Sequence, residues 1–194
     1  LQDKGGDENW RLYAVNLDSG EIRDLTPYEK VQVQVVAVDK HFPNELLIGM
    51  NKEDPKFHDV YHLDLPTGQL KLTAKNPGNI VAWVADARLK IRGAMVATPE
   101  GGFDLLVRPT EEAEWEKLVA WSAEDSLTSH PVSFNKEGDA LYLVDSRNAN
   151  AGRLVQMDLG TKKADVIAQD PQYDVGGVMI HPDTYQVQAV AFTR

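Results

Sequence analysis

The chain has 194 residues, 42% of them hydrophobic, and its 30 acidic and 20 basic side chains give a net charge of −10. This length and apolar content are enough to bury the core of one domain, or of a large part of one. The acidic balance repels nucleic-acid phosphates and anionic membrane surfaces, so we expect neither nucleic acid nor a membrane as a partner.

The chain contains no cysteine, which excludes disulfide bonds, thiolate catalysis and cysteine-based zinc sites. This composition fits a reducing compartment, and no signal segment opens the chain, so we expect a cytoplasmic location. No apolar run approaches the roughly 20 residues that cross a bilayer. The first residue is Leu1 rather than Met, which indicates a piece of a longer protein.

The first element along the chain is a strand, a tight turn and a second strand in residues 12–26, LYAVNLDSGEIRDLT. Asp18 and Gly20 suit the turn, because Asp can bond its own backbone and Gly reaches a positive φ without a Cβ clash. The same unit returns in residues 60–73, VYHLDLPTGQLKLT, and in a weaker copy in residues 154–168.

These copies recur with a nearly constant period. One anchor lies in the third strand of each unit, with spacings of 48, 45 and 48, at Tyr13, Tyr61, Leu106 and Leu154. A second, independent anchor lies in another turn, with spacings of 47, 49 and 47, at Asp39, Asp86, Asn135 and Pro182. Two anchors in constant phase indicate a repeat protein.

Each period is predicted to hold four short strands. The predicted strands of the three complete periods are 33–38, 46–50, 60–65 and 70–74; 80–85, 89–97, 103–108 and 115–121; 131–134, 140–144, 153–159 and 164–168. A further strand is expected at 187–193, and one short turn within 122–129. Helix signals are poor, because Gly and Pro recur too often for long helices.

A four-stranded unit of about 40–50 residues that repeats is typical of a β-propeller blade. We therefore predict an all-β fold, a partial β-propeller of four-stranded antiparallel blades with three full blades and two half blades. The predicted boundaries are a half blade at 1–30, blades at 31–77, 78–125 and 126–173, and a half blade at 174–194. Two hypotheses follow for the exposed blade edges. Either the two half blades meet and close a four-bladed ring, or two chains self-associate through these edges.

Motifs of catalysis and of cofactor binding are missing from the sequence. There is no G-x-S-x-G nucleophile elbow, H-E-x-x-H, P-loop or G-x-G-x-x-G, so we predict no catalytic, cofactor-binding or metal-binding residue. His58 and His62 have a spacing that suits metal ligands on a helix. On a strand they are about 13 Å apart, which favours a structural role.

Three acidic or polar loops occupy the same position between the second and third strands of their units, at 2–9, 51–59 and 145–152. Corresponding loops of a repeat lie on one face. That face is expected to carry Asp3, Asp7, Glu8, Glu53, Asp54, Asp59, Asp145 and Arg147. It is either a solvated loop surface or a contact face for a partner domain or a cationic peptide terminus.

The residues also carry a family resemblance. Residues 2–27, QDKGGDENWRLYAVNLDSGEIRDLTP, resemble the propeller of prolyl oligopeptidase family serine peptidases, most of all the acylaminoacyl-peptidase-like branch. Similar runs follow at 54–68 (DPKFHDVYHLDLPTG), 124–127 (EDSL), 141–147 (LYLVDSR) and 174–182 (DVGGVMIHP). The resemblance covers most of the chain.

The resemblance implies a parent enzyme in which a propeller gates access to a C-terminal α/β-hydrolase domain with Ser, Asp and His. No triad residue can be assigned in this chain, so we expect it to be no enzyme by itself. Its implied partners are the missing hydrolase domain and, in the parent, peptide substrates. Asp7, Glu8 and Asp54 are predicted to lie in loops that face the missing domain or the substrate.

Two other functions remain open from the sequence. The chain is a free-standing propeller scaffold for protein–protein interaction, or a propeller that binds a small ligand or sugar in its central channel. The peptidase interpretation requires a hydrolase domain beyond Arg194, whereas the scaffold requires a natural stop near it.

Overall fold

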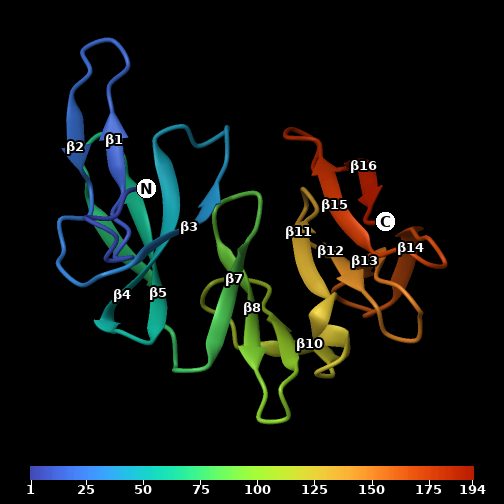
Figure 1. Cartoon of the computed structure of the whole chain (residues 1–194). Coiled ribbons are helices and arrows are strands. Elements are labelled where there is room, and N and C mark those ends of the chain that lie inside the picture. Colours follow the sequence, from blue (N-terminus) through green and yellow to red (C-terminus); the bar gives the residue numbers. More distant parts are fainter. The chain divides into compact units, whose positions relative to one another are not determined.

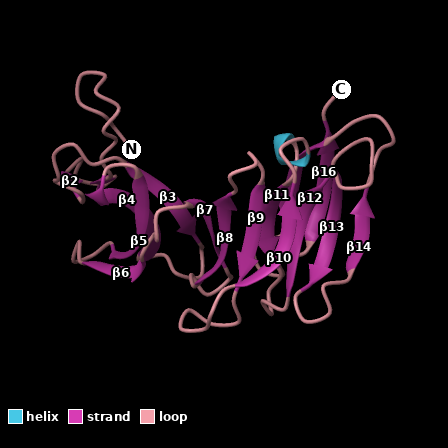
Figure 2. Cartoon of the chain, turned by 90° about the horizontal axis from the view of Figure 1, so that it is seen from below, coloured by secondary structure: helices cyan, strands magenta, loops and turns pink.

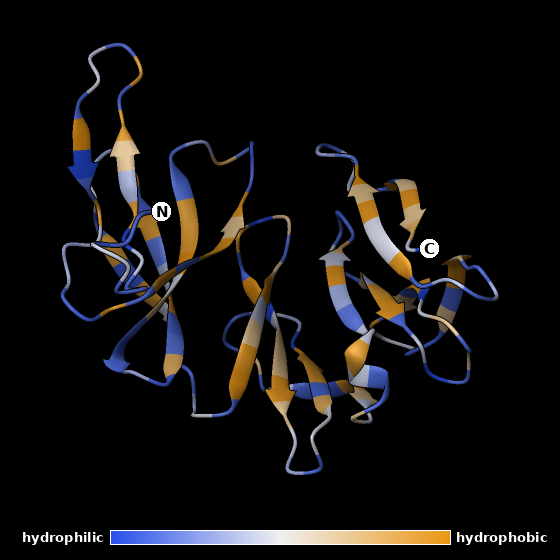
Figure 3. Ribbon diagram, in the orientation of Figure 1, coloured by the Kyte–Doolittle hydropathy of each residue, from blue (hydrophilic) through white to orange (hydrophobic).

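The computed structural model describes all residues, 1–194, and the chain forms two compact units, Leu1–Ile80 and Val81–Arg194, which are described separately. Every sheet is antiparallel, and the strands of each sheet follow one another in sequence order. There are three four-stranded and two two-stranded sheets. Hydrophobic residues lie along the strands and hydrophilic ones gather in the turns (Figure 3).

Unit 1 contains a hairpin and a four-stranded sheet (Figure 1). The hairpin strands are β1 (Tyr13–Val15) and β2 (Ile22–Asp24), and the sheet strands are β3 (Val33–Val38), β4 (Glu45–Asp54), β5 (Phe57–Asp64) and β6 (Leu70–Ala74).

The β1–β2 turn is built from local hydrogen bonds. The Asn16 side-chain oxygen accepts from the backbone N–H groups of Asp18 and Ser19, and Gly20 has a φ of +73°. The β5–β6 turn repeats this pattern with Asp64 as the acceptor and Gly68 in the left-handed region. Such turns need an acceptor side chain followed by glycine, which explains why the sequence repeats them.

The core of unit 1 joins the hairpin to the sheet. Leu25, Val33, Ile48 and Leu63 are buried in one cluster, and Leu12 and Ala14 of the hairpin side pack against it. The hairpin is also held by Arg23, whose guanidinium donates to the carbonyl oxygens of Leu65 at 2.6 Å and Pro66 at 3.1 Å.

Unit 2 contains two four-stranded sheets and a final hairpin. The first sheet is β7 (Ile80–Ala85), β8 (Ile91–Ala97), β9 (Phe103–Val107) and β10 (Glu116–Trp121); the second is β11 (His130–Phe134), β12 (Ala140–Asp145), β13 (Arg153–Asp158) and β14 (Ala164–Ala168); the hairpin is β15 (Val175–Ile180) and β16 (Val187–Phe192). A 3₁₀ turn, η1 (Asp125–Leu127), lies beside the start of β11 (Figure 2).

The two sheets of unit 2 share one core. Met95, Leu105 and Trp121 of the first sheet are buried in the same cluster as Phe134 and Leu143 of the second. Strand β12 is buried at all six positions, so it is covered on both faces. A continuous apolar run, rather than an alternating one, is what a strand covered on both sides requires.

The all-β fold of four-stranded antiparallel blades predicted from the sequence is confirmed. The strands 33–38, 70–74, 80–85 and 164–168 have the predicted bounds. Strand β4 is longer than the predicted 46–50, because it pairs with β5 as far as Asp54 opposite Phe57. The blade boundaries at 30, 77, 125 and 173 stay predictions. The chain contains no helix with the length and apolarity that a membrane crossing needs.

Replacement of Leu141 by Ala should lower the free energy of unfolding of unit 2 by about 2–5 kcal/mol, because a fully buried leucine leaves a cavity in a shared core. Urea denaturation followed by tryptophan fluorescence measures this. Leu127→Ala removes the same atoms from a side chain that is 86% exposed and should change stability by less than about 0.5 kcal/mol. Equal losses in the two variants would contradict the shared core.

Candidate functional site

The loop that carries Asp7 and Glu8 is closed at its base by a bridge between Gln2 and Arg11, whose backbones exchange two hydrogen bonds of 3.0 and 2.8 Å. The Asp7 carboxylate accepts from the backbone N–H and the side-chain amide of Asn9, at 3.1 and 3.2 Å. These bonds lower the pKa of Asp7 below its ordinary value, and the bond from the Asn9 side chain has the largest effect. Glu8 adopts a φ of +58°, and its side chain is exposed.

Asp54 lies at the tip of the β4–β5 hairpin, where its carboxylate accepts from the backbone N–H of Lys56 at 2.9 Å. The tip is polar and exposed, from Lys52 to Lys56. The Asn51 side chain closes it by donating to the carbonyl oxygen of Pro55 at 3.0 Å.

Gln32 connects the Asp7 loop to this hairpin. Its side-chain amide donates to the carbonyl oxygen of Glu8 at 3.2 Å, and its backbone N–H donates to the Asn51 side chain at 2.7 Å. The structure thus brings the two acidic loops of unit 1 to one residue and leaves the three predicted carboxylates, those of Asp7, Glu8 and Asp54, exposed. Lys52 and Lys56 share the tip with Asp54, so the excess of negative charge lies in the loop of Asp7 and Glu8. Its role as an interface stays a prediction.

Two acids that we expected on an exposed polar face are buried, so that part of the prediction is wrong. Asp59 is 5% exposed and accepts from the backbone N–H of Asn76 at 2.7 Å. The Asn76 amide in turn donates to the carbonyl oxygen of Ile80 at 2.7 Å. Asp145 is 4% exposed. Both carboxylates satisfy buried donors instead of meeting solvent.

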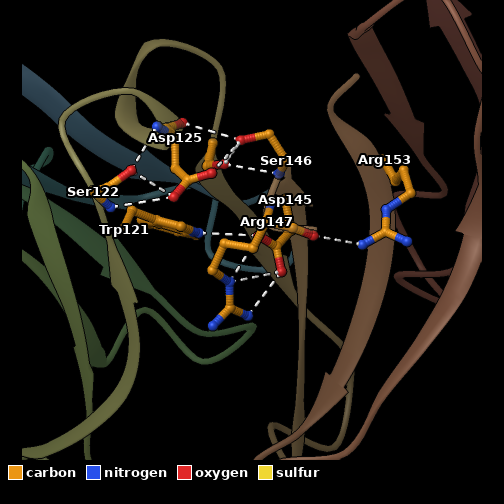
Figure 4. Close-up of polar contacts among 8 residues, drawn as sticks. Trp121, Ser122, Asp125, Asp145, Ser146, Arg147 and Arg153 are labelled. Carbon is orange, nitrogen blue, oxygen red and sulfur yellow. Dashed lines mark hydrogen bonds and ion pairs between the residues drawn. The ribbon is translucent and has the colours of Figure 1, made fainter. Parts of the chain in front are cut away.

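Asp145 is the centre of a polar network at the end of β12 (Figure 4). It accepts from the Trp121 indole N–H at 3.2 Å and from Nη2 of Arg147 at 2.8 Å and Nε at 3.0 Å. Arg153, from the start of β13, donates to the carbonyl oxygen of Arg147 at 2.9 Å. A buried carboxylate is stable only with such partners.

A second group of contacts fixes η1 next to this network (Figure 4). The Asp125 carboxylate accepts from the hydroxyls of Ser122 at 2.6 Å and Ser146 at 3.1 Å. The Ser146 hydroxyl also lies 3.0 Å from that of Ser129, which is buried. These bonds tie the loop after β10 to the loop after β12, so the arrangement is suited to rigidity.

The electrostatics of Asp145 follow from opposing effects. Burial raises its pKa, but the hydrogen bonds and charge of Arg147 and the bond from Trp121 outweigh this, and the pKa lies below the ordinary value of 3.8. The same pairing raises the pKa of Arg147. The pair is therefore ionised at neutral pH.

The contact made by His62 agrees with the structural role that we predicted for this histidine. His62 Nε2 lies 2.7 Å from the Glu45 carboxylate across the β4–β5 ladder. No group of three or more His, Cys, Asp or Glu side chains is placed to hold a metal ion.

No family model matches the chain. It is 40% identical over 191 residues to dipeptidyl aminopeptidase BIII of Pseudoxanthomonas mexicana, and 26% identical over 204 residues to dipeptidyl peptidase family member 6 of Caenorhabditis elegans. These alignments take in 98% and 97% of the chain, but the chain spans only 28% and 27% of the two relatives.

Solved structures agree with the fold. Prolyl oligopeptidase B from Galerina marginata matches 86% of the chain with a TM-score of 0.58 at 11% identity, over 24% of its own length. TolB from Acinetobacter baumannii matches 94% of the chain with a TM-score of 0.61 at 13% identity, over 43% of its length. The chain is a propeller segment related to the prolyl oligopeptidase family. The resemblance in the sequence is thereby confirmed, while its acylaminoacyl-peptidase-like branch stays a prediction.

The sequence did not reveal the burial of Asp145 or the connecting role of Gln32. A signal for Asp145 exists in LYLVDSR, where an aspartate directly ends an apolar run and an arginine follows two residues later. Its indole partner is 24 residues away, so local pattern could not pair them.

Replacement of Asp145 by Asn should lower stability at pH 7 by about 1–3 kcal/mol, because Arg147 loses its charged partner in a buried site. The folded pKa is depressed, so the contribution of Asp145 is complete above 3.8 and is lost as the pH falls through the lower folded pKa. Denaturation at several pH values should therefore show the difference between wild type and variant shrinking below about pH 4.

The control is Asp165→Asn, which removes the same charge from a side chain that is 75% exposed and lies 3.8 Å from Lys163. It should leave stability nearly unchanged. A gap between wild type and Asp145→Asn that persists undiminished at pH 2 would contradict the assignment.

Proposed function

We propose that this chain is a non-catalytic propeller segment of a prolyl oligopeptidase family serine peptidase. In the parent protein it gates the access of peptides to a C-terminal α/β-hydrolase domain. The observation that carries this proposal is the 40% identity to a dipeptidyl aminopeptidase along nearly the whole chain. Since the chain corresponds to 28% of that relative, most of the relative's length is available for a catalytic domain.

The motifs of the sequence support this assignment of roles. The chain has no nucleophile elbow, so the parent's peptide-bond hydrolysis requires residues outside it. Rigid sheets with short turns suit a wall that limits the size of what enters. In this proposal, substrate selection belongs to the propeller and bond cleavage to the hydrolase domain.

The acidic loops of unit 1 are proposed as the part of this wall that meets the hydrolase domain or the substrate. Asp7, Glu8 and Asp54 are exposed, and the hydrogen bonds to Asp7 keep its carboxylate charged at mildly acidic pH. Cationic groups, such as the amino terminus of a peptide, are attracted to such a cluster and are steered to it over a Debye length of about 8 Å.

The decisive experiment is to read the source reading frame beyond Arg194 and to express the whole protein. We expect a G-x-S-x-G elbow with later Asp and His, hydrolysis of dipeptidyl chromogenic substrates by the whole protein, and none by the 194-residue chain. A reading frame that ends near Arg194, with a protein partner recovered by pull-down, would instead support the free-standing scaffold.

In the whole protein, the triple variant with Asp7, Glu8 and Asp54 each changed to Ala should lower kcat/KM for a cationic dipeptide substrate by about tenfold. Each exposed carboxylate contributes only weakly, because solvent screens it, so the loss is expected from the removal of all three together. Steady-state kinetics with the free and the N-acetylated substrate measure it.

A matched control removes three other exposed acids of unit 1, in the triple variant Asp18→Ala, Glu21→Ala and Glu29→Ala. It changes the net charge by the same amount and should leave kcat/KM within about twofold. If both triple variants behave like wild type in kinetics and in stability, the proposed role of the acidic loops is wrong.

A further inference from the structure

Unit 2 contains a cleft of about 700 Å³ at one end of its two four-stranded sheets. It lies among the β7–β8, β9–β10, β11–β12 and β13–β14 turns, and we call it the turn cleft. Its lining residues fall within 86–92, 107–116, 136–139 and 159–160. This volume is in the range of small-ligand sites, about 300–1,000 Å³. The loop 145–152 joins the other ends of β12 and β13, away from these turns.

Two arginines are fixed at the cleft, Arg92 in β8 and Arg108 directly after the end of β9. The Arg108 backbone N–H donates to the carbonyl oxygen of Arg92, and Nε of Arg92 donates to the carbonyl oxygen of Arg108, each at 3.0 Å. Nε of Arg108 donates to the carbonyl oxygen of Ile91, also at 3.0 Å. The Arg108 guanidinium lies 4.2 Å from the centre of the Trp115 ring. Backbone bonds and an aromatic face thus hold it in place before any ligand arrives.

Some of the other charges near Arg92 and Arg108 are already paired. Arg92 lies 3.5 Å from the Asp86 carboxylate. Glu111 lies 3.5 Å from Lys90 and accepts from the backbone N–H of Ile91 at 3.1 Å. Paired groups of this kind have little left to offer a ligand.

Arg108 differs from its neighbours, because part of its guanidinium has no acceptor. Nη2 is buried without a hydrogen-bond partner. Nη1 also has no hydrogen bond and is not among the fully buried atoms, and Arg108 lines the cleft. Leaving a guanidinium unsatisfied in a partly buried site is costly. Since Nε is bonded to Ile91 and Nη2 is buried, Nη1 is the donor left for a ligand, and a carboxylate suits it because the hydrogen bond is charge-assisted.

The cleft also offers unpaired groups of the opposite sign. The side chains of Glu112, Glu116 and Glu137 line it and form no ion pair. Burial lowers the pKa of Arg108, and the nearby charges of Glu111 and Glu112 oppose this shift. A ligand that satisfies both kinds of group carries a carboxylate at one end and an ammonium group at the other.

We propose that the turn cleft binds a short peptide by its two termini, with the carboxylate on Arg108 and the ammonium group near the unpaired glutamates. A dipeptide or tripeptide has this pair of charges and fits the volume. The proposal does not rest on the gating role, because the turn cleft is a separate part of the chain from the loops of Asp7, Glu8 and Asp54. It identifies a peptide site that needs no hydrolase domain.

The test is titration of the 194-residue chain with alanyl-alanine, followed by the indole N–H resonance of Trp115 and by calorimetry. We expect a saturable shift of the Trp115 signal. The C-terminal amide and the N-acetyl form of the same dipeptide should each bind about tenfold more weakly, because each lacks one charge-assisted contact.

Arg108→Gln should reduce affinity for the free dipeptide by about ten- to hundredfold and remove the discrimination against the amide. The matched control is Arg194→Gln, since Arg194 also lies over an aromatic ring, 5.6 Å from the centre of Tyr173, but outside the cleft. The affinity of the Arg194→Gln variant for the free dipeptide should equal that of wild type.

The capped peptides test the proposal on the unaltered chain, whatever Arg108→Gln does to folding. We expect a Kd of about 1 mM or lower for the free dipeptide. The proposal is overturned if the free dipeptide causes no Trp115 shift at about 10 mM, which is about ten times that Kd. Equal affinity for the free, amidated and acetylated forms would overturn it as well. Activity of the whole protein plays no part in this readout, so failure here leaves the gating proposal intact.

Discussion

Strand β12 is buried at every position from Ala140 to Asp145, and the construction of unit 2 depends on this burial. A strand covered on both faces can carry only apolar side chains along its length, and its backbone must pair completely with β11 and β13. Polar groups are therefore displaced to its ends. At one end, Asp145 must find donors, and Trp121 and Arg147 provide them. At the other, the turn before Ala140 opens into the cleft beside Arg92 and Arg108.

The same constraint orders unit 1. Leu47 and Ile48 of β4 have no exposed surface, whereas the tip of the hairpin that β4 enters is fully polar. The charges that can meet another molecule are thus confined to loops, while the sheets fix where those loops are. Gln32 then holds two such loops together through one amide and one backbone N–H. A rigid frame with polar loops is the usual arrangement of a binding surface.

Much of the fold could be predicted because its signals are local. The strand at 33–38 is followed by a turn in which Asp39 accepts from the backbone N–H of His41, and the strand at 70–74 is preceded by one in which Asp64 accepts from that of Thr67. The last residues of β4 were missed, because the run N-K-E-D is polar and its pairing with β5 is irregular between Met50 and Asp54. The surroundings of the site residues were harder to predict from the sequence. Asp59 and Asp145 have partners 17 and 24 residues away, and only the folded chain shows that these carboxylates are buried.

One contact in the turn cleft bears on how this sequence can diverge. Gly138 has a φ of +75°, and a Cβ added there would overlap Nη1 of Arg92. A side chain at position 138 would have to displace the guanidinium tip of Arg92, and the left-handed backbone strains any residue with a Cβ there, whatever stands at position 92. Glycine in the β11–β12 turn thus leaves Arg92 in the place from which its Nε reaches the Arg108 carbonyl oxygen. We expect glycine to be kept at position 138 among descendants of this sequence, because a shorter residue at position 92 would remove the clash but not the backbone strain.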